Sequence, residues 1–205
     1  MEYDGSRRSF LAASGTAVAA ALAGCSDDGG EAAPDEIDDD SRPSIGDASA
    51  PVSVTVFEDF GCPACRQFKL QATPAIVEQY VDPGNVRYLH ADFPIPVDET
   101  WSYPVASAAR GVFETAGNDA FWEFSASIYD HQGSYSLDTI ESVADDVAGV
   151  GTAARDAAEG ETHRDRIEAD RERGERWGVS GTPTVFVDDE QVPPDEIAEA
   201  IESRL

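Results

Sequence analysis

Two cysteines, Cys62 and Cys65, lie three positions apart in the run Cys62-Pro63-Ala64-Cys65, between a predicted strand and a predicted helix. The first amides of a helix lack helical partners and, together with the helix dipole, they stabilise a thiolate at that position. Pro63 fits the first turn of a helix without the loss of a hydrogen bond. The spacing therefore predicts a redox-active pair in which Cys62 is the attacking thiol and Cys65, one turn further in, resolves the mixed disulfide.

Two other roles remain open for these cysteines. A zinc site of the paired-cysteine kind needs two more ligands, but the third cysteine, Cys25, lies near the N-terminus and the three histidines lack ligand-like spacing. A static disulfide in the first turn of a helix would close so small a loop that it would add little stability. We therefore favour redox chemistry, and we expect neither a metal nor another cofactor.

A second feature suited to this chemistry is Thr182-Pro183, directly before a predicted strand at residues 184–188. A cis peptide bond has a low energetic cost only before proline, and we predict that the Thr182–Pro183 bond is cis. An ordinary Gly-Thr-Pro turn is the alternative. Beside the cysteines, a cis-proline loop would expose the Thr182 backbone for pairing with an extended substrate. Phe60 and Pro63 flank the cysteines and are expected to form an apolar rim that contacts unfolded clients.

The elements that would position these residues follow an α/β pattern. Valine-rich runs bounded by turn residues predict the strands, and a helix that Pro74 kinks or interrupts follows the cysteines. Helical spacing predicts a helical insertion at about residues 99–177, in which the aromatic run at 121–124 forms core rather than a binding site. A helix at 195–205 follows the last strand. The predicted strands lie at residues 51–58, 85–91, 184–188 and 191–192.

The N-terminal residues resemble an export signal. Arg7 and Arg8 precede an alanine-rich apolar run at 12–23, which is too short to span a membrane as a stable helix. The adjacent arginines resemble a twin-arginine signal, which carries already folded proteins across a membrane. The run ends in Leu22-Ala23-Gly24-Cys25, which resembles a lipobox, so we predict that Cys25 carries a lipid. An incidental thiol in a discarded peptide is the alternative.

A change in composition divides the rest of the chain. Residues 26–48 consist mainly of Asp, Glu, Gly, Ala and Pro, and such a segment cannot bury enough apolar surface to offset the entropy of ordering. We therefore predict a signal with a lipobox at 1–25, an acidic disordered linker at 26–48 and a folded domain at 49–205. The linker is expected to hold the domain clear of the membrane.

The chain is strongly acidic, with 41 Asp and Glu residues against 14 Lys and Arg residues, for a net charge of -27. Such a surface repels phosphate groups, which excludes nucleic acid as a partner. Lysine is almost absent, because Lys69 is the only one in the chain. At molar salt the Debye length falls to about 3 Å, which screens the repulsion between carboxylates. The composition therefore indicates a salt-loving host, and a merely soluble acidic protein is the alternative.

Several short runs occur in the order found in one known family. They are Phe60-Gly61-Cys62-Pro63-Ala64-Cys65, Thr73-Pro74, Asp92-Phe93-Pro94, Phe121-Trp122-Glu123-Phe124 and Trp177-Gly178-Val179-Ser180-Gly181-Thr182-Pro183. From about Ala50 to Leu205, the chain resembles the DsbA-like branch of the thioredoxin-fold oxidoreductases. The resemblance implies a thioredoxin-like α/β fold with an inserted helical domain and an extracytoplasmic dithiol-disulfide exchange activity. It implies that Cys62 is the nucleophile, Cys65 the resolving thiol and Thr182-Pro183 the cis-proline loop.

The sequence departs from this family near the cysteines. Many relatives carry a buried acid on the first strand, six residues before the nucleophile, where this chain has Val56. Glu58 and Asp59 lie nearby, but strand alternation and the loop location predict that both face solvent, so proton transfer is expected to use water or Glu58. His90, at the end of a strand, is expected to be structural. The dipeptide Pro63-Ala64 lacks the histidine of strongly oxidising members, which leaves the redox direction open.

Together these features predict a haloarchaeal-type exported lipoprotein that forms or exchanges disulfides in exported proteins that contain cysteines. The lipid on Cys25 would anchor it to the outer face of the cell membrane, and we expect a monomer. A quinone-linked membrane oxidase is the expected acceptor that reoxidises the reduced pair. Two alternatives stay open, namely a membrane-tethered disulfide reductase and a redox-inactive thioredoxin-fold lipoprotein that binds unfolded clients.

Overall fold

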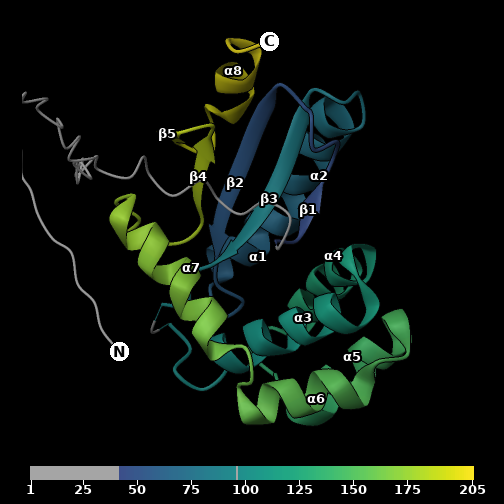
Figure 1. The fold of residues 1–205 in the computed structure, drawn as a ribbon. Coiled ribbons are helices and arrows are strands. Elements are labelled where there is room, and N and C mark those ends of the chain that lie inside the picture. Colours follow the sequence, from purple (N-terminus) through teal and green to yellow (C-terminus); the bar gives the residue numbers. More distant parts are fainter. Residues whose placement is uncertain (1–41, 96) are drawn as a thin grey trace, which may run out of the picture. The chain divides into compact units, whose positions relative to one another are not determined.

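The computed structural model describes residues 42–95 and 97–205 of the chain. The predicted signal at 1–25, with Cys25, and most of the predicted linker at 26–48 lie outside the described residues. In the described part, five strands form one mixed sheet in the order β1-β3-β2-β4-β5 (Figure 1). This mixed sheet with its helices confirms the predicted α/β fold class.

The sheet is built around β2 (Val52–Glu58), which ends four residues before Cys62. It pairs in parallel with β3 (Val86–Asp92) and in antiparallel fashion with β4 (Thr184–Val187). Every residue of β2 and β3 is buried or half-buried, which explains why these strands are valine-rich instead of alternating strictly between apolar and polar residues. The outer strands are β1 (Ser44–Ile45), antiparallel to β3, and β5 (Glu190–Val192), antiparallel to β4.

The helix that follows the cysteines is interrupted, as Pro74 predicted. Proline has no N–H and cannot continue the regular helical hydrogen bonds, so the run alternates between α-helical and π-helical turns. One π-helical turn carries Lys69 and buries it. The segments are α1 (Pro63–Gln67), η2 (Phe68–Ala72), α2 (Thr73–Ile76) and η3 (Val77–Val81).

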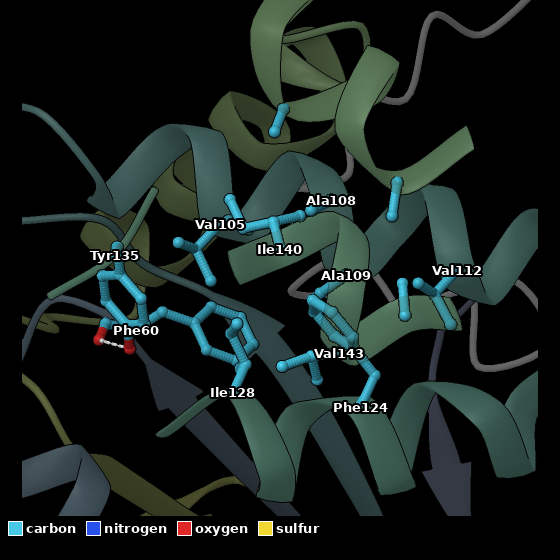
Figure 2. Close-up of a cluster of buried hydrophobic side chains, with 14 of the residues drawn as sticks. Phe60, Val105, Ala108, Ala109, Val112, Phe124, Ile128, Tyr135, Ile140 and Val143 are labelled. Carbon is cyan, nitrogen blue, oxygen red and sulfur yellow. Dashed lines mark hydrogen bonds between the residues drawn. The ribbon is translucent and has the colours of Figure 1, made fainter. Parts of the chain in front are cut away.

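The predicted helical insertion is confirmed between β3 and β4. Figure 1 shows α3 to α6 together at one end of the sheet, with α7 leading back toward β4. Phe121 and Phe124 are fully buried in the core of this insertion, as predicted, and Figure 2 shows Phe124 among other apolar side chains of that core. The helices are α3 (Ser102–Ala116), α4 (Asn118–Ile128), η4 (Tyr129–His131), α5 (Leu137–Ala148), α6 (Gly151–Gly160) and α7 (Arg164–Arg176), and α8 (Ile197–Glu202) follows β5. None of the helices in residues 42–95 and 97–205 combines the length and the apolar character needed to cross a membrane.

The folded part begins earlier than its composition predicted, because β1 lies inside the segment expected to be a disordered linker. The Arg42 side chain is buried and forms an ion pair with Asp170 on α7. The amide of Ser44 donates a hydrogen bond to Asn118 Oδ1 at 2.9 Å, and Asn118 Nδ2 donates to the carbonyl oxygen of Ser44 at 2.6 Å. These contacts are made with residues far along the chain, so local hydrophobicity did not reveal them.

The same ion pair belongs to a buried chain of charges that reaches the end of β2. Arg110 on α3 contacts Asp170 at 2.6 Å and Asp92 on β3 at 2.6 Å. Asp92 in turn contacts His90, whose other ring nitrogen contacts Glu58. Buried charges are costly unless they are paired, and each of these charged side chains has a partner of opposite sign or a hydrogen bond. Of these charged side chains, Glu58 lies closest in sequence to Cys62.

Candidate active site

Cys62 and Cys65 lie at the junction of β2 and α1. The amide of Cys62 donates a hydrogen bond to the carbonyl oxygen of Asp59 at 2.9 Å, which closes the turn between the two elements. Cys62 is extended, and Pro63 takes the first position of α1, as the sequence predicted. Both cysteines are free thiols, and their exposed fractions are 6% for Cys62 and 0% for Cys65.

The two thiols have opposite acidities. A hydrogen bond from the Cys65 thiol outweighs the opposing effect of burial and lowers the pKa of Cys62 to about 5, with help from the backbone amides of Cys65 and Ala64. Burial raises the pKa of Cys65 far above its ordinary value, and the hydrogen bond to Cys62 and the charge of Glu58 act in the same direction. The pair therefore combines an ionised outer sulfur with a protonated inner sulfur at neutral pH.

The Thr182–Pro183 peptide bond is cis, as the sequence predicted. The sulfur of Cys62 lies 3.3 Å from the carbonyl oxygen of Thr182, to which the protonated thiol donates a hydrogen bond. The cis-proline loop therefore lies directly beside the outer sulfur. Thr182 and Pro183 are both half-buried, so part of each remains accessible to a second molecule.

A groove of about 320 Å³ runs beside this loop along α1 and η2. Pro63, which adjoins the groove in sequence and was expected to belong to an apolar rim, is exposed. Phe60 is not part of that rim, because its exposed fraction is 1%. Its ring stacks on Tyr129, with 5.2 Å between the ring centroids, and belongs to the core of the insertion. The residues that line the groove are Ala64, Gln67, Phe68, Gln71, Ala72, Pro183 and Pro194.

The expectation that Glu58 and Asp59 face solvent is wrong, because their exposed fractions are 1% and 2%. The alternation argument assumed a strand with one open face, whereas β2 is central and covered on both faces. Asp59 accepts hydrogen bonds from the amides of Gly61 at 2.8 Å and Ile95 at 3.0 Å and from the hydroxyl of Ser102 at 3.1 Å. Burial nevertheless raises the pKa of Asp59 to about 6.

Glu58 and His90 form a buried pair close to the inner sulfur. His90 Nδ1 lies 3.0 Å from Glu58 Oε2, and His90 Nε2 lies 3.0 Å from Asp92 Oδ1. Burial disfavours the charged imidazolium, but Asp92 and Glu58 together outweigh it and raise the pKa of His90. The amide of Asp59 donates to the sulfur of Cys65 at 3.4 Å, so this sulfur lies beside the peptide that follows Glu58.

Two polar atoms near this pair have no hydrogen-bond partner among the described residues, namely Glu58 Oε1 and Lys69 Nζ. Lys69 lies over the ring of Trp122, with its nitrogen 4.0 Å from the ring centroid. Burial lowers the pKa of Lys69 to about 8, and the charge of Glu58 partly opposes this effect. A carboxylate with a free acceptor atom and a lysine that titrates near neutral pH therefore lie within electrostatic range of each other.

Sequence reasoning named Glu58 as one of two routes for proton transfer, but it missed the burial of Glu58, its contact with His90 and the buried Lys69. One signal was available for Glu58, which lies two residues after Val56, because strand residues two apart share a face. Another was the status of Lys69 as the only lysine in the chain. The contact between Glu58 and His90 depends on the register between β2 and β3, in which Val56 faces His90, and local patterns do not specify that register.

Among residues 42–95 and 97–205, no group of three or more His, Cys, Asp and Glu side chains is arranged to hold a metal ion.

The ionisation of Cys62 leads to a first prediction. Alkylation of the reduced protein by iodoacetamide is expected to show a midpoint near pH 5 for Cys62, against about 8.5 for an ordinary thiol. Because the folded-state pKa lies below the unfolded one, this contribution to the stability of the reduced fold is complete above about pH 8.5 and is lost as the pH falls through 5. Cys65 in the same sample is the internal control and is expected to stay unreactive. A Cys62 midpoint near pH 8.5 would contradict the geometry described above.

Comparisons with known proteins agree with this fold. The family model described as Thioredoxin matches residues 38–203. The chain is 28% identical over 178 residues to the "Probable disulfide bond formation protein D" of Bacillus cereus, which covers 80% of this chain and 79% of that protein. The crystal structure of oxidised BdbD from Bacillus subtilis superposes with a TM-score of 0.74 at 24% identity and covers 80% of this chain and 93% of that one.

DsbA from Chlamydia trachomatis has the same fold, with a TM-score of 0.72 at 21% identity over 83% of this chain and 94% of that one. The family match spans most of the chain, including β1, the cysteines, the insertion and the cis-proline loop. The chain therefore belongs to the thioredoxin family, and its fold is that of BdbD and DsbA.

Proposed function

We propose that this enzyme forms disulfides in exported proteins by thiol-disulfide exchange at Cys62 and Cys65. The observation that carries the proposal is the placement of the two sulfurs, with Cys62 directly before α1 and beside the cis-proline loop and Cys65 fully buried behind it. In this geometry the pKa of Cys62 falls to about 5, while burial raises that of Cys65. A stabilised Cys62 thiolate favours the reduced pair over the disulfide. The oxidised enzyme would then act as a disulfide donor, which supports the oxidase direction over the reductase.

The proposed exchange moves two electrons from the substrate to the enzyme. A substrate thiolate attacks the sulfur of Cys62 in the Cys62–Cys65 disulfide, a mixed disulfide forms, and Cys65 leaves as a thiolate and takes up a proton. A second substrate thiolate then attacks the substrate sulfur of the mixed disulfide, and Cys62 leaves as a thiolate. The substrate gains one disulfide, and the enzyme holds one proton at Cys65.

We assign the transfer of the Cys65 proton to Glu58. Its carboxylate is buried, it acts on the pKa of Cys65 through its charge, and one of its oxygens has no partner among the described residues. Glu58 occupies the same face of β2 as Val56, one pleat closer to the cysteines. It therefore takes the role that many relatives give to an acid at the position of Val56. His90 and Lys69 supply the compensating positive charge.

Substrate binding is proposed at the cis-proline loop and the neighbouring groove. An extended segment would pair with the Thr182 backbone, which places a substrate cysteine next to the sulfur of Cys62. The apolar parts of Pro63 and Pro183 and the groove along α1 would accept side chains of unfolded clients without demanding one sequence. Phe60 has no direct part in this surface because it is buried.

An assay of the purified protein at molar salt tests the proposed activity. The wild-type enzyme, oxidised beforehand, is expected to introduce disulfides into a reduced, unfolded test protein at a one-to-one ratio of enzyme to disulfide formed. Electrophoresis without reductant and mass spectrometry measure both products. If the enzyme reduces insulin readily but leaves the reduced test protein unchanged, the reductase assignment replaces the oxidase. If it does neither, the proposed activity is wrong.

We further propose that the enzyme works outside the cytoplasm at the outer face of the cell membrane. A lipid on Cys25 would anchor it, residues 26–41 would serve as the tether, and the net charge of -27 suits a salt-loving, haloarchaeal host. Disulfides persist in such compartments, whereas the cytosol reduces them. A monomer is proposed, and a quinone-linked membrane oxidase is the proposed acceptor for the electrons of the reduced pair.

Export through the twin-arginine route provides a second prediction. Replacement of Arg7 and Arg8 with Lys is expected to leave uncleaved precursor inside the cell, because lysine does not substitute for the arginine pair in such signals. Fractionation followed by immunoblotting measures the distribution. Arg164→Lys, an equally conservative change outside the signal, is the control and is expected to leave export unchanged. Normal export of the Arg7 and Arg8 variant would remove the twin-arginine assignment.

A further inference from the structure

The segment that joins α4 to α5 contacts the turn before Cys62. Gln132 Nε2 and the Tyr135 hydroxyl each donate a hydrogen bond to the carbonyl oxygen of Phe60, both at 2.9 Å. The Tyr129 hydroxyl donates to the carbonyl oxygen of Asp59 at 3.4 Å. Figure 2 shows the bond between Tyr135 and Phe60 beside the apolar core of the insertion. We name Tyr129, Gln132 and Tyr135 the carbonyl clamp.

The peptide between Phe60 and Gly61 is held at both of its polar ends. A carbonyl oxygen has two lone pairs, and at Phe60 the carbonyl clamp occupies both. The amide of Gly61 donates to Asp59 Oδ1 at 2.8 Å. The next peptide is held as well, because the amide of Cys62 donates to the carbonyl oxygen of Asp59. Two consecutive peptides before the reactive sulfur therefore have a fixed orientation.

Gly61 makes this restraint necessary. A Cβ at this position would lie 2.5 Å from the oxygen of Ser102 and 2.8 Å from the Cβ of Asp98, so no larger residue fits without a shift. Glycine leaves the backbone freer than any other residue. The hydrogen bonds of the carbonyl clamp and of Asp59 thus supply the restraint that a side chain would otherwise provide.

We propose that the carbonyl clamp positions Cys62 from the helical insertion and thereby sets the redox potential of the Cys62–Cys65 pair. This inference rests on the proposed function and adds three positioning residues to it. Tyr129, Gln132 and Tyr135 bind backbone carbonyl groups and act on the reaction through the turn.

The carbonyl clamp acts mainly on the reduced enzyme. In the oxidised enzyme the disulfide itself fixes Cys62 against Cys65. In the reduced enzyme the two sulfurs are not bonded, and the turn and the start of α1 keep the Cys62 thiolate beside the Cys65 thiol and the amides of Ala64 and Cys65. Reduction adds two electrons and one proton to the disulfide and gives the Cys62 thiolate and the Cys65 thiol. Loss of the clamp therefore disfavours the reduced products and lowers the potential.

A redox titration of clamp variants against glutathione tests the inference. The variant Tyr135→Phe keeps the ring and loses the hydroxyl, and Gln132→Met keeps the length of the side chain and loses the donor. In the double variant the equilibrium constant for reduction by glutathione is expected to fall about tenfold, which corresponds to about 30 mV. In each single variant this equilibrium constant is expected to fall about threefold. The absorbance of the thiolate is expected to titrate at a higher pH in the same proteins.

The control is Tyr80→Phe, which removes a hydroxyl bonded to Glu202 at 3.0 Å, away from the cysteines. It is expected to keep the wild-type constant. The inference would be overturned if the folded Tyr135→Phe and Gln132→Met proteins both showed the wild-type equilibrium constant with glutathione and the wild-type thiolate titration. The single variants give this answer even if the double variant does not fold. If the wild-type protein itself exchanges no disulfide, the proposed function fails. This outcome differs from one in which the wild type is active and the variants behave like it, which overturns only the role of the carbonyl clamp.

Discussion

Cys65→Ser is expected to convert the enzyme into a covalent trap for its substrates, whereas Cys62→Ser is expected to abolish exchange. A protein with Cys62 alone can exchange with a substrate disulfide and form a mixed disulfide, but it lacks the thiol that resolves it. Without Cys62, the buried and protonated Cys65 offers no reactive thiolate. Mass spectrometry of the variants after incubation with a disulfide-containing peptide measures the adduct.

Cys25→Ser is the matched control for these variants, because Cys25 is the third cysteine of the chain. The full chain with this change is expected to exchange disulfides at the wild-type rate in solution and to differ only in its attachment to the membrane. A Cys62→Ser protein that still oxidises reduced test proteins would show that another group carries the reaction. A Cys65→Ser protein that releases its adduct as fast as the wild type would remove the resolving role of Cys65.

Glu58→Gln is expected to slow the resolution of a mixed disulfide by about 100-fold, within the range that general acid–base catalysis contributes. Glutamine keeps the size of the side chain and a hydrogen bond to His90, but it cannot take a proton from Cys65 at neutral pH. The thiolate needed to attack the mixed disulfide would then form only by proton transfer to water. Rapid-mixing measurements on the enzyme–glutathione mixed disulfide isolate this step, because Cys65 alone resolves it.

Glu78→Gln, at an exposed carboxylate on η3, is the control and is expected to resolve the mixed disulfide at the wild-type rate. The Cys62 alkylation profile of the Glu58→Gln protein is expected to keep its low midpoint, since Glu58 acts on Cys65. Resolution at the wild-type rate in Glu58→Gln would mean that water alone carries the proton, which is the other route that the sequence left open.

The parts of the site that could be predicted from the sequence are those specified by short runs. The spacing of Cys62 and Cys65 after a strand placed both thiols at the start of a helix, and the Thr182-Pro183 dipeptide before a strand predicted the cis bond. Pro74 predicted the interrupted helix in the same way. Each of these features depends on steric rules that act within a few residues.

The features that sequence reasoning missed depend on contacts across the fold. Glu58 looks exposed in an alternating strand, but β2 is central and both of its faces are covered. Asp59 looks exposed in a loop, but Ile95 and Ser102 donate hydrogen bonds to its buried carboxylate. Phe60 looks available to clients, but the insertion buries its ring and binds its carbonyl group. Arg42 lies in an acidic, polar segment and is nevertheless part of the fold through Asp170 on α7. Local composition carries no information about these long-range partners.

The measurement that tests the account most directly is a redox titration of the Cys62–Cys65 pair at molar salt, repeated between pH 6 and pH 8. The account predicts one two-electron couple whose potential falls by about 30 mV per pH unit, because reduction takes up one proton when one of the two product thiols is already ionised. A slope of about 60 mV per pH unit would mean that both thiols are protonated and Cys62 is an ordinary cysteine. The absence of any reversible couple between these two sulfurs would contradict the account as a whole.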